Sequence, residues 1–395
     1  MDLKTGILNF LTANRRNIYG LAEEIHKNPE LSGREHGACE RLSRELESGG
    51  FEVTRGVEGL PTAFLAELPN PKSGSGPSIA FLAEYDALPE MGHACGHNLI
   101  GTASVYAGLA LAGLADRPAG RVIVIGTPAE ETSGAKIDML AKGVFDRVDF
   151  ALMFHPASVT CVNVRSFANM PFEVTFRGRS SHAAASPERG INALDAMISL
   201  FVNLGLARKH LPDQVRIPGI ITHGGVRPNI VPDKTVGRFS LRANDLPRLE
   251  QVIEVFRRCV RSSAGAHGAR FRIRQYESSY REMRSNGPLA ESFAANLERV
   301  GIEVDVAEND RRGSIDMGSV SQKIPAIHPT LRLGDGSVST HTAKFAELTG
   351  SQDGFETARL AAATLAMTGL DLLLDDGLRK RAAADFRQAE RAVEL

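Results

Sequence analysis

Hydrophobic and polar positions follow a helical period at the start of the chain. Apolar residues recur at helical spacing through the first 25 residues, and a second such pattern covers 35–47 and stops at Gly49 and Gly50. A period near 3.6 places these positions on one face of a helix, so we expect two amphipathic helices here. The apolar positions are Ile7, Phe10, Leu11, Ile18, Leu21 and Ile25.

Short apolar runs then alternate with a second helical pattern. The runs read SIAFLAEYD, RVIVIGTPAE and VDFALMFHP, and the helical pattern between the first two spans 98–114. Buried strands separated by helices predict an α/β domain whose central, mostly parallel sheet is flanked by helices. The Pro-, Gly- and Ser-rich stretch at 69–78 predicts a loop, and we expect it to form a hairpin tip.

The pattern changes again near residue 169. A strand, a helix, two strands, an amphipathic helix and a last strand follow one another up to about residue 280. This βαββαβ order is typical of a ferredoxin-like α+β module. We therefore expect a catalytic domain at 1–168, an inserted module at 169–282, and a return to the catalytic domain at 283–395.

Composition and charge narrow the class of protein. A chain of 395 residues is too long for one ordinary core, and 43% hydrophobic with 24% charged residues is typical of soluble proteins. With 46 basic and 47 acidic residues, we expect neither nucleic acid nor a membrane surface as partner. No apolar run approaches a membrane span. Four scattered cysteines and an N-terminus unlike a signal peptide favour the cytoplasm.

Potentially catalytic side chains follow the predicted strands. Asp86, the pair Glu130 and Glu131, and His155 each come after an apolar run. Because ligands gather beyond the carboxyl ends of parallel strands, we expect these residues to share one cleft. Cys95 and His97 lie two apart in HACGHN. Together these residues offer ligands for a borderline divalent metal and a spare carboxylate for proton transfer, which favours metal-assisted hydrolysis.

Simpler interpretations apply to several of these residues. Taken alone, Glu130 and Glu131 could be a charge pair at a helix N-terminus, stabilised by the helix dipole. Asp316 could shape the site, and His93 suits a structural role. Small buried core residues are the better interpretation of Cys39, Cys161 and Cys259. Surface or structural roles are expected for His26, His36, His210, His223, His267 and His328.

An ordered set of motifs resembles one known family over nearly the whole chain. The motifs are HACGHN, PAEE, SSHAAASP, RPNIVPD, DMGSVS with PAIHP, and STHT. Their order and spacing resemble the M20 metallopeptidase and amidohydrolase family. The similarity is greatest to the branch that holds aminoacylases, auxin-conjugate amidohydrolases and the group of p-aminobenzoyl-glutamate hydrolase and aminoacylase-1-like protein 2.

The resemblance implies a role for each matching residue. It implies two divalent metal ions, most naturally zinc but also manganese or cobalt, with Cys95 bridging them. The full set of implied ligands is Cys95, His97, Glu131, His155 and His341. Glu130 matches the general base, and Asp86 matches the carboxylate that steers a ligand. Asn98 replaces the family's usual aspartate, and we expect this to remove a charge beside the metals.

The resemblance also gives the inserted module a role as a lid and dimerisation domain, so a homodimer is expected. Within it, His182 matches an oxyanion donor that often reaches the partner subunit's site, and Asn229 and Arg242 match substrate-binding positions. The implied reaction is metal-dependent hydrolysis of the amide bond of an N-acyl amino acid, a p-aminobenzoyl-glutamate-like conjugate or a dipeptide.

Two other classes of protein stay open at this point. One is a non-catalytic, metal-dependent binding or scaffold protein of the same fold, which Glu130→Gln would distinguish because only an enzyme loses turnover. The other is a zinc-stabilised structural protein, which would need a closed four-ligand site.

Overall fold

The computed structural model describes residues 2–70, 72, 74, 76–212, 214–308 and 313–394. The chain forms two compact units: the first comprises Met1–Arg165, Met283–Arg312 and Asp316–Leu395, and the second Ser166–Glu282 and Gly313–Ile315. The second unit thus begins three residues before the expected boundary at 169. It also includes a short return segment, because the Phe167 amide donates a hydrogen bond to the Gly313 carbonyl at 2.8 Å.

A six-stranded sheet forms the centre of the first unit. Its order is β1 (Glu52–Arg55), β2 (Phe64–Glu67), β4 (Arg121–Gly126), β3 (Ser78–Ala83), β5 (Phe150–Leu152) and β13 (Ala326–Ile327). The last four strands are mutually parallel, as expected, whereas β2 is antiparallel to both of its neighbours, β1 and β4. The hairpin expected at 69–78 is wrong, because β4 lies between β2 and β3. Positions 71, 73 and 75 of that stretch lie outside the described residues.

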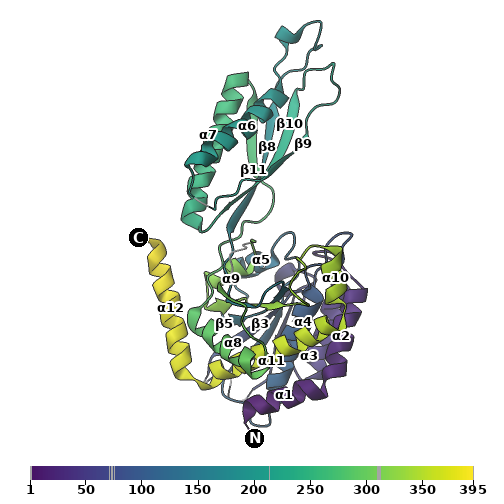
Figure 1. Ribbon diagram of the computed structural model, residues 1–395, viewed down its shortest axis with the longest axis vertical. Coiled ribbons are helices and arrows are strands. Elements are labelled where there is room, and N and C mark those ends of the chain that lie inside the picture. Colours follow the sequence, from purple (N-terminus) through teal and green to yellow (C-terminus); the bar gives the residue numbers. More distant parts are fainter. Residues whose placement is uncertain are drawn as a thin grey trace. The chain divides into compact units, whose positions relative to one another are not determined.

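Helix α4 (His97–Ala112) is the central helix of this unit. Its side chains are buried from His97 to Leu111, because it packs on β3 and β4 and is covered by other helices (Figure 1). The surrounding helices are α1 (Leu3–Ala13), α2 (Arg15–Lys27), α3 (His36–Ser48), α8 (Gly287–Arg299), α11 (Gln352–Leu374) and α12 (Asp376–Glu394). The predicted helices at 35–47 and 98–114 correspond to α3 and α4.

Helix α11 corrects the expectation that no segment of the chain is apolar enough to approach a membrane span. Among the described residues it alone is long and apolar enough to cross a membrane by length and composition. However, 72% of its most apolar window is buried inside the protein, where it packs against α4. This burial is typical of the core helix of a globular domain.

The returning segment completes a second, smaller sheet. Its strands are β12 (Val306–Glu308), β7 (Cys161–Asn163), β14 (Thr330–Arg332) and β6 (His155–Ala157), in that order. β14 pairs with β6 in parallel, just as β13 pairs with β5. Residues on both sides of the inserted unit therefore fix the strand that carries His155. The short helices α5 (Ala135–Ala141), α9 (Met317–Ser321) and α10 (Ala343–Thr349) complete the unit.

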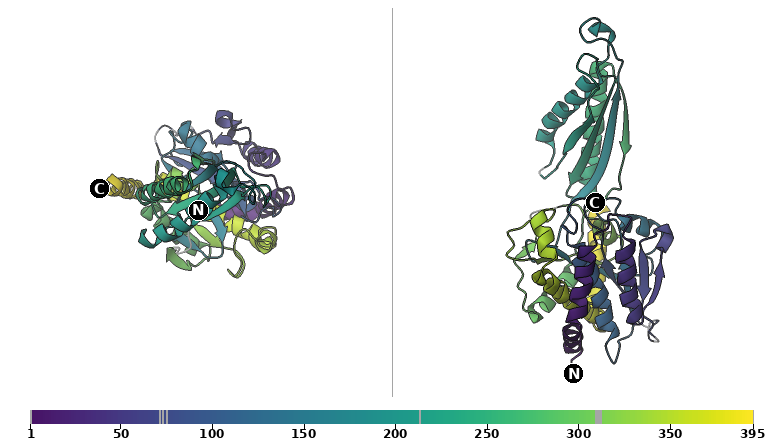
Figure 2. Two further views of the ribbon diagram at one scale, coloured as in Figure 1. Left: turned by 90° about the horizontal axis from the view of Figure 1, so that it is seen from above. Right: turned by 90° about the vertical axis from the view of Figure 1, so that its right-hand side faces the viewer.

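The second unit has the predicted βαββαβ order. Its elements are β8 (Ala168–Arg177), α6 (Ala193–Ala207), β9 (Gly219–His223), β10 (Lys234–Ala243), α7 (Leu246–His267) and β11 (Arg270–Gln275). The antiparallel sheet has the order β11-β8-β10-β9. Helices α6 and α7 cover one face of this sheet, as Figures 1 and 2 show. Their core includes Phe172, Phe176, Phe239, Leu241 and Phe256.

Candidate metal centre

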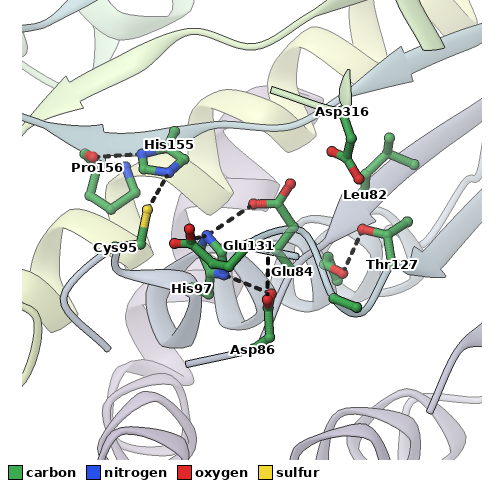
Figure 3. A network of polar contacts seen from close by, with 12 residues as sticks. Leu82, Glu84, Asp86, Cys95, His97, Thr127, Glu131, His155, Pro156 and Asp316 are labelled. Atoms are coloured by element: carbon green, nitrogen blue, oxygen red, sulfur yellow. Dashed lines mark hydrogen bonds and ion pairs between the residues drawn. The ribbon is translucent and has the colours of Figure 1, made fainter. Parts of the chain in front are cut away.

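The candidate ligands converge at one edge of the large sheet. Asp86 follows β3, Glu130 and Glu131 follow β4, and His155 begins β6 directly beyond β5. These strands are parallel, so their carboxyl ends lie at the same edge. Figure 3 shows the side chains of Cys95, His97, Glu131 and His155 directed toward one another.

The ligand atoms form two groups that share Cys95. One group is Cys95, His97 and His155, and the other is Cys95, Glu131 and His341; within each group the atoms lie within 4.8 Å of one another. The Cys95 Sγ lies 3.4 Å from His155 Nε2 and 3.3 Å from His341 Nε2. The structure thus brings together all five ligands that the sequence suggested, with the thiol in the middle.

Backbone geometry explains the position of Cys95 and His97. Gly96 has φ = 84° and begins α4, so His97 occupies the first helical residue. A Cβ at Gly96 would lie 2.4 Å from the Pro156 side chain, and glycine avoids this clash because it has no Cβ. On the returning segment, the His341 amide donates to the Ala94 carbonyl at 2.8 Å. This bond joins the two ligand loops.

Asp86 orients the ring of His97. Its carboxylate accepts hydrogen bonds from His97 Nδ1 at 2.9 Å, Ser32 Oγ at 2.7 Å and the Glu131 amide at 3.1 Å. Burial opposes ionisation of Asp86, but His97 and these hydrogen bonds outweigh it and lower the pKa of this carboxyl. Because Nδ1 is engaged, His97 presents Nε2 to the cluster, as metal-binding histidines do.

Unpaired buried atoms provide a test of whether the site fits a metal. His97 Nε2 and Glu131 Oε1 are buried, make no hydrogen bond and lie 3.9 Å apart. Each atom also faces an ionic neighbour at 3.5 Å, Glu84 Oε2 for His97 and His341 Nε2 for Glu131. A buried polar atom without a hydrogen bond costs about 1–3 kcal/mol, and a cation bound between the two would remove that cost. Burial raises the pKa of the Cys95 thiol, and a divalent cation would remove its proton. Thiolate, imidazole and carboxylate donors fit a divalent metal of the zinc type.

Glu130 lies with His97 and Glu131 in a third group whose ligand atoms are within 4.8 Å of one another. Helix α5 begins only at Ala135, so the interpretation of the two glutamates as a helix-terminal pair is wrong. Burial, and the negative charges of Asp316, Glu84 and Glu131, raise the pKa of Glu130 well above its usual range. A carboxyl with a raised pKa suits proton transfer near neutral pH.

A buried triad of charged side chains, Lys136, Glu84 and Asp316, lies beside the candidate ligands, and little in the sequence predicts it. Lys136 Nζ lies 2.6 Å from Glu84 Oε1 and 2.8 Å from Asp316 Oδ1, and all three side chains are buried. Glu84 Oε2 lies 3.5 Å from His97 Nε2, and Figure 3 shows this carboxylate directed toward the His97 ring. Asp316 was expected to shape the site, but Lys136 resembles an ordinary exposed helix residue in sequence.

The contacts of Asn98, His93 and His328 show where these three side chains lie relative to the candidate ligands. The Asn98 amide donates to the Ala22 and Thr349 carbonyls at 3.2 and 3.0 Å, so it joins α4 to two other segments, and its effect on the charge beside the metals stays a prediction. His93 donates to a backbone carbonyl of α2 at 3.1 Å and has a structural role. His328 is buried, and its ring centroid lies 5.5 Å from that of His155. His328 belongs to the motif PAIHP, but only a surface or structural role was expected for it.

The second unit holds the other three candidate residues at two places. His182 is exposed, its Nδ1 accepts the Ala184 and Ala185 amides at 3.3 and 3.1 Å, and it pairs with Ile230 next to Asn229. Arg242 lies at the other end of β10, where its Nε donates to Ser240 Oγ at 3.2 Å. Burial lowers the pKa of Arg242. The structure therefore groups His182 with Asn229 but not with Arg242.

A parallel α/β sheet with a cysteine, histidine and carboxylate cluster at its carboxyl edge, and a buried glutamate of raised pKa beside it, defines a metal-dependent hydrolase. The profile of peptidase family M20/M25/M40 matches residues 80–364. The chain therefore belongs to peptidase family M20/M25/M40, and the family and hydrolase class expected from the motifs are confirmed.

Known proteins agree with this assignment. Xaa-Arg dipeptidase of Mus musculus is 37% identical over 380 residues, covering 93% of this chain and 88% of the relative. One of the subunits of p-aminobenzoyl-glutamate hydrolase of Escherichia coli (strain K12) is 35% identical over 277 residues, covering 65% and 56%. The fold is similar to a dinuclear metal-binding M20 peptidase, YXEP of Bacillus subtilis, with TM-score 0.70, 22% identity and coverage of 91% and 99%.

Proposed function

We propose that this protein hydrolyses the amide bond of dipeptides or N-acyl amino acids, including p-aminobenzoyl-glutamate-like conjugates, with two bound divalent cations. The observation that carries the proposal is the pair of ligand groups that share Cys95. The dipeptidase and p-aminobenzoyl-glutamate hydrolase among the relatives support the substrate class. Zinc suits the thiolate and imidazole ligands best, and manganese or cobalt can use the same set.

Each residue of the centre has a defined task in this reaction. The cations, when bound, would lower the pKa of a water molecule and polarise the scissile carbonyl. Glu130 would accept the proton of the attacking water at its carboxylate and later donate it to the leaving amine. Asp86 holds the His97 ring in position throughout.

The second unit supplies groups for substrate binding. The Arg242 guanidinium suits a substrate carboxylate, because its planar fork can donate two parallel hydrogen bonds. In neutral His182, Nδ1 accepts backbone amides, so the proton resides on Nε2 and can stabilise an oxyanion. Lys234 and Arg242 are eight residues apart on β10, about 26 Å at 3.3 Å per residue. His182 pairs with Ile230, beyond the Lys234 end of this strand. One second unit therefore cannot bring His182 and Arg242 to the same small substrate.

A homodimer resolves this separation, because His182 and Asn229 of one protomer would serve the site of its partner. Two features of the second unit support such an interface. Helix α6 exposes an apolar stripe at i, i+4 and i+8, formed by Ile198, Val202 and Leu206, which are 50%, 56% and 54% exposed. Strand β9 is an edge strand of its sheet and exposes Ile220.

The location of the protein in the cytoplasm, which the sparse cysteines and the N-terminal sequence favour, stays a prediction.

The test is release of free amine from dipeptides with C-terminal arginine, other N-acyl amino acids and p-aminobenzoyl-glutamate. Each is incubated with zinc, manganese or cobalt, and with a chelator as control. We expect chelator-sensitive release that Glu130→Gln lowers by at least about a hundredfold while metal stoichiometry is unchanged. Metal-loaded, folded protein that binds these compounds without turnover would instead support the non-catalytic binding protein.

A further inference from the structure

The open face of the second unit carries an unusual row of cations. Arg177 of β8 lies directly opposite Lys234 of β10 on one side and Arg270 of β11 on the other. All three side chains are exposed, and all lie on the face opposite α6 and α7, because the alternate residues Phe176 and Ile273 pack into the core. Like charges directly opposite one another destabilise a sheet.

A neighbouring row on the same face shows how the chain neutralises such charges. Arg238 and Arg274 lie opposite Glu173 in the same three strands. Their guanidinium groups pair with its carboxylate at 3.1 and 2.8 Å. The row at Arg177 contains no carboxylate in a comparable position. Among the described residues no ion pair engages Arg177, Lys234 or Arg270, so the electrostatic cost of this row remains unless an anion binds there.

A cavity lies over the uncompensated row. Its volume is about 350 Å³, and its walls include Arg177, Lys234, Arg270 and Arg272 together with the hydroxyl-bearing Thr175. Glu173 also borders it, but the two arginines of its own row engage that carboxylate. The cavity is at the lower end of the size range for small-molecule sites.

We propose that this cavity binds a small, multiply charged oxyanion of the phosphate or diphosphate class. Three guanidinium groups and one ammonium group provide the forked donors and point charge that phosphoryl oxygens favour, and Thr175 adds a hydroxyl donor. These four cations line a single cavity of about 350 Å³, which is a size that favours a small oxyanion over a nucleic acid. Binding removes the repulsion within the row and so stabilises the second unit.

The test is calorimetric titration of the full chain with inorganic phosphate, inorganic diphosphate and citrate, at matched ionic strength. We expect saturable binding, tightest for diphosphate, and a rise in Tm beyond that given by sodium chloride. Citrate distinguishes phosphoryl from carboxylate chemistry, and binding equal to that of diphosphate would overturn the phosphoryl assignment. Tighter binding of a single-stranded oligonucleotide than of diphosphate would overturn the choice of a small ligand.

Two variants locate the binding. Arg177→Gln with Arg270→Gln should weaken diphosphate binding at least tenfold and, at low salt without ligand, raise the Tm because repulsion is relieved. Arg261→Gln is the control, since it removes an exposed arginine of α7, which covers the other face of the sheet and lies outside the cavity, and it should retain wild-type binding. The double variant keeps the metal centre. Undiminished binding by this variant would therefore place the anion elsewhere and overturn the proposal.

Discussion

Lys136 is a buried cation held between two buried carboxylates, Glu84 and Asp316. Lys136→Met keeps most of the side-chain volume but leaves both carboxylates without their partner. Removing one member of a buried ion network costs about 3–5 kcal/mol, so we expect the free energy of unfolding to fall by that amount. Urea denaturation measures it, with Lys344→Met as an exposed control that changes stability by less than about 0.5 kcal/mol. Equal stabilities of the two variants would contradict this account.

Cys39 links stability to alkaline pH. Burial raises the pKa of this thiol to about 11, and the neighbouring Ser43 acts in the opposite direction. Between about pH 9 and 11 the unfolded chain loses a proton that the native protein keeps, so stability falls as pH rises, by at most about 1.4 kcal/mol per unit. Cys39→Ala should lose this component in urea denaturation at pH 8, 9 and 10. Cys259→Ala, which removes a half-buried thiol, should show a smaller change.

The sequence was informative about residues whose chemistry depends on local position. Cys95, His97, Glu131 and His155 could be predicted as a group because each lies near the end of a recognisable buried strand or the start of the following helix. His341 depended on the family resemblance, since its own segment is short and generic. Lys136 and His328 could not be predicted, because only tertiary packing buries them against Glu84, Asp316 and His155.

Gly96 joins the Cys95 loop to α4, so its replacement tests how the start of this helix positions the metal ligands. Gly96→Ala forces a side chain into a positive φ and against Pro156, so the helix start must shift. We expect a loss of at least about 1–2 kcal/mol in stability and at least tenfold weaker zinc affinity, because Cys95 and His97 move with that junction. Isothermal titration and urea denaturation measure both quantities.

Gly20→Ala is the matched control for that substitution. Gly20 lies within α2, and a Cβ there meets no atom within 4 Å. Replacing it should stabilise the protein by about 0.5–1 kcal/mol and leave zinc affinity unchanged. Unchanged zinc affinity in Gly96→Ala as well would show that the loop tolerates the shift.

Elements with a sustained period were predicted well, and short ones were not. Helix α4 and the six elements of the second unit follow the expected order, because each repeats its pattern over several turns or alternations. Strands β13 and β14 have two and three residues, too few to show any period. The hairpin expected at 69–78 was wrong because strand pairing is decided by partners far along the chain, and β2 pairs with β4.

The proposed homodimer makes a prediction for the whole molecule. Val202→Glu with Leu206→Glu places two charges on the exposed apolar stripe of α6. We expect light scattering to show monomers in place of dimers, with amide hydrolysis lost and metal stoichiometry retained, because His182 no longer reaches a partner's site. Leu374→Glu, at an apolar position of the first unit that is similarly exposed, should stay dimeric. A dimeric double variant would place the interface elsewhere.

The pairing of β13 with β5 and of β14 with β6 also governs how the protein can be made. During synthesis on the ribosome, β5 and β6 emerge long before their partners, and the inserted unit is translated in between. Nearly all of that unit is contiguous in sequence, so it can collapse first, while β5 keeps a free, apolar edge. Nascent chains that end before residue 326 should therefore depend on chaperones, and the metal centre can assemble only near the end of translation.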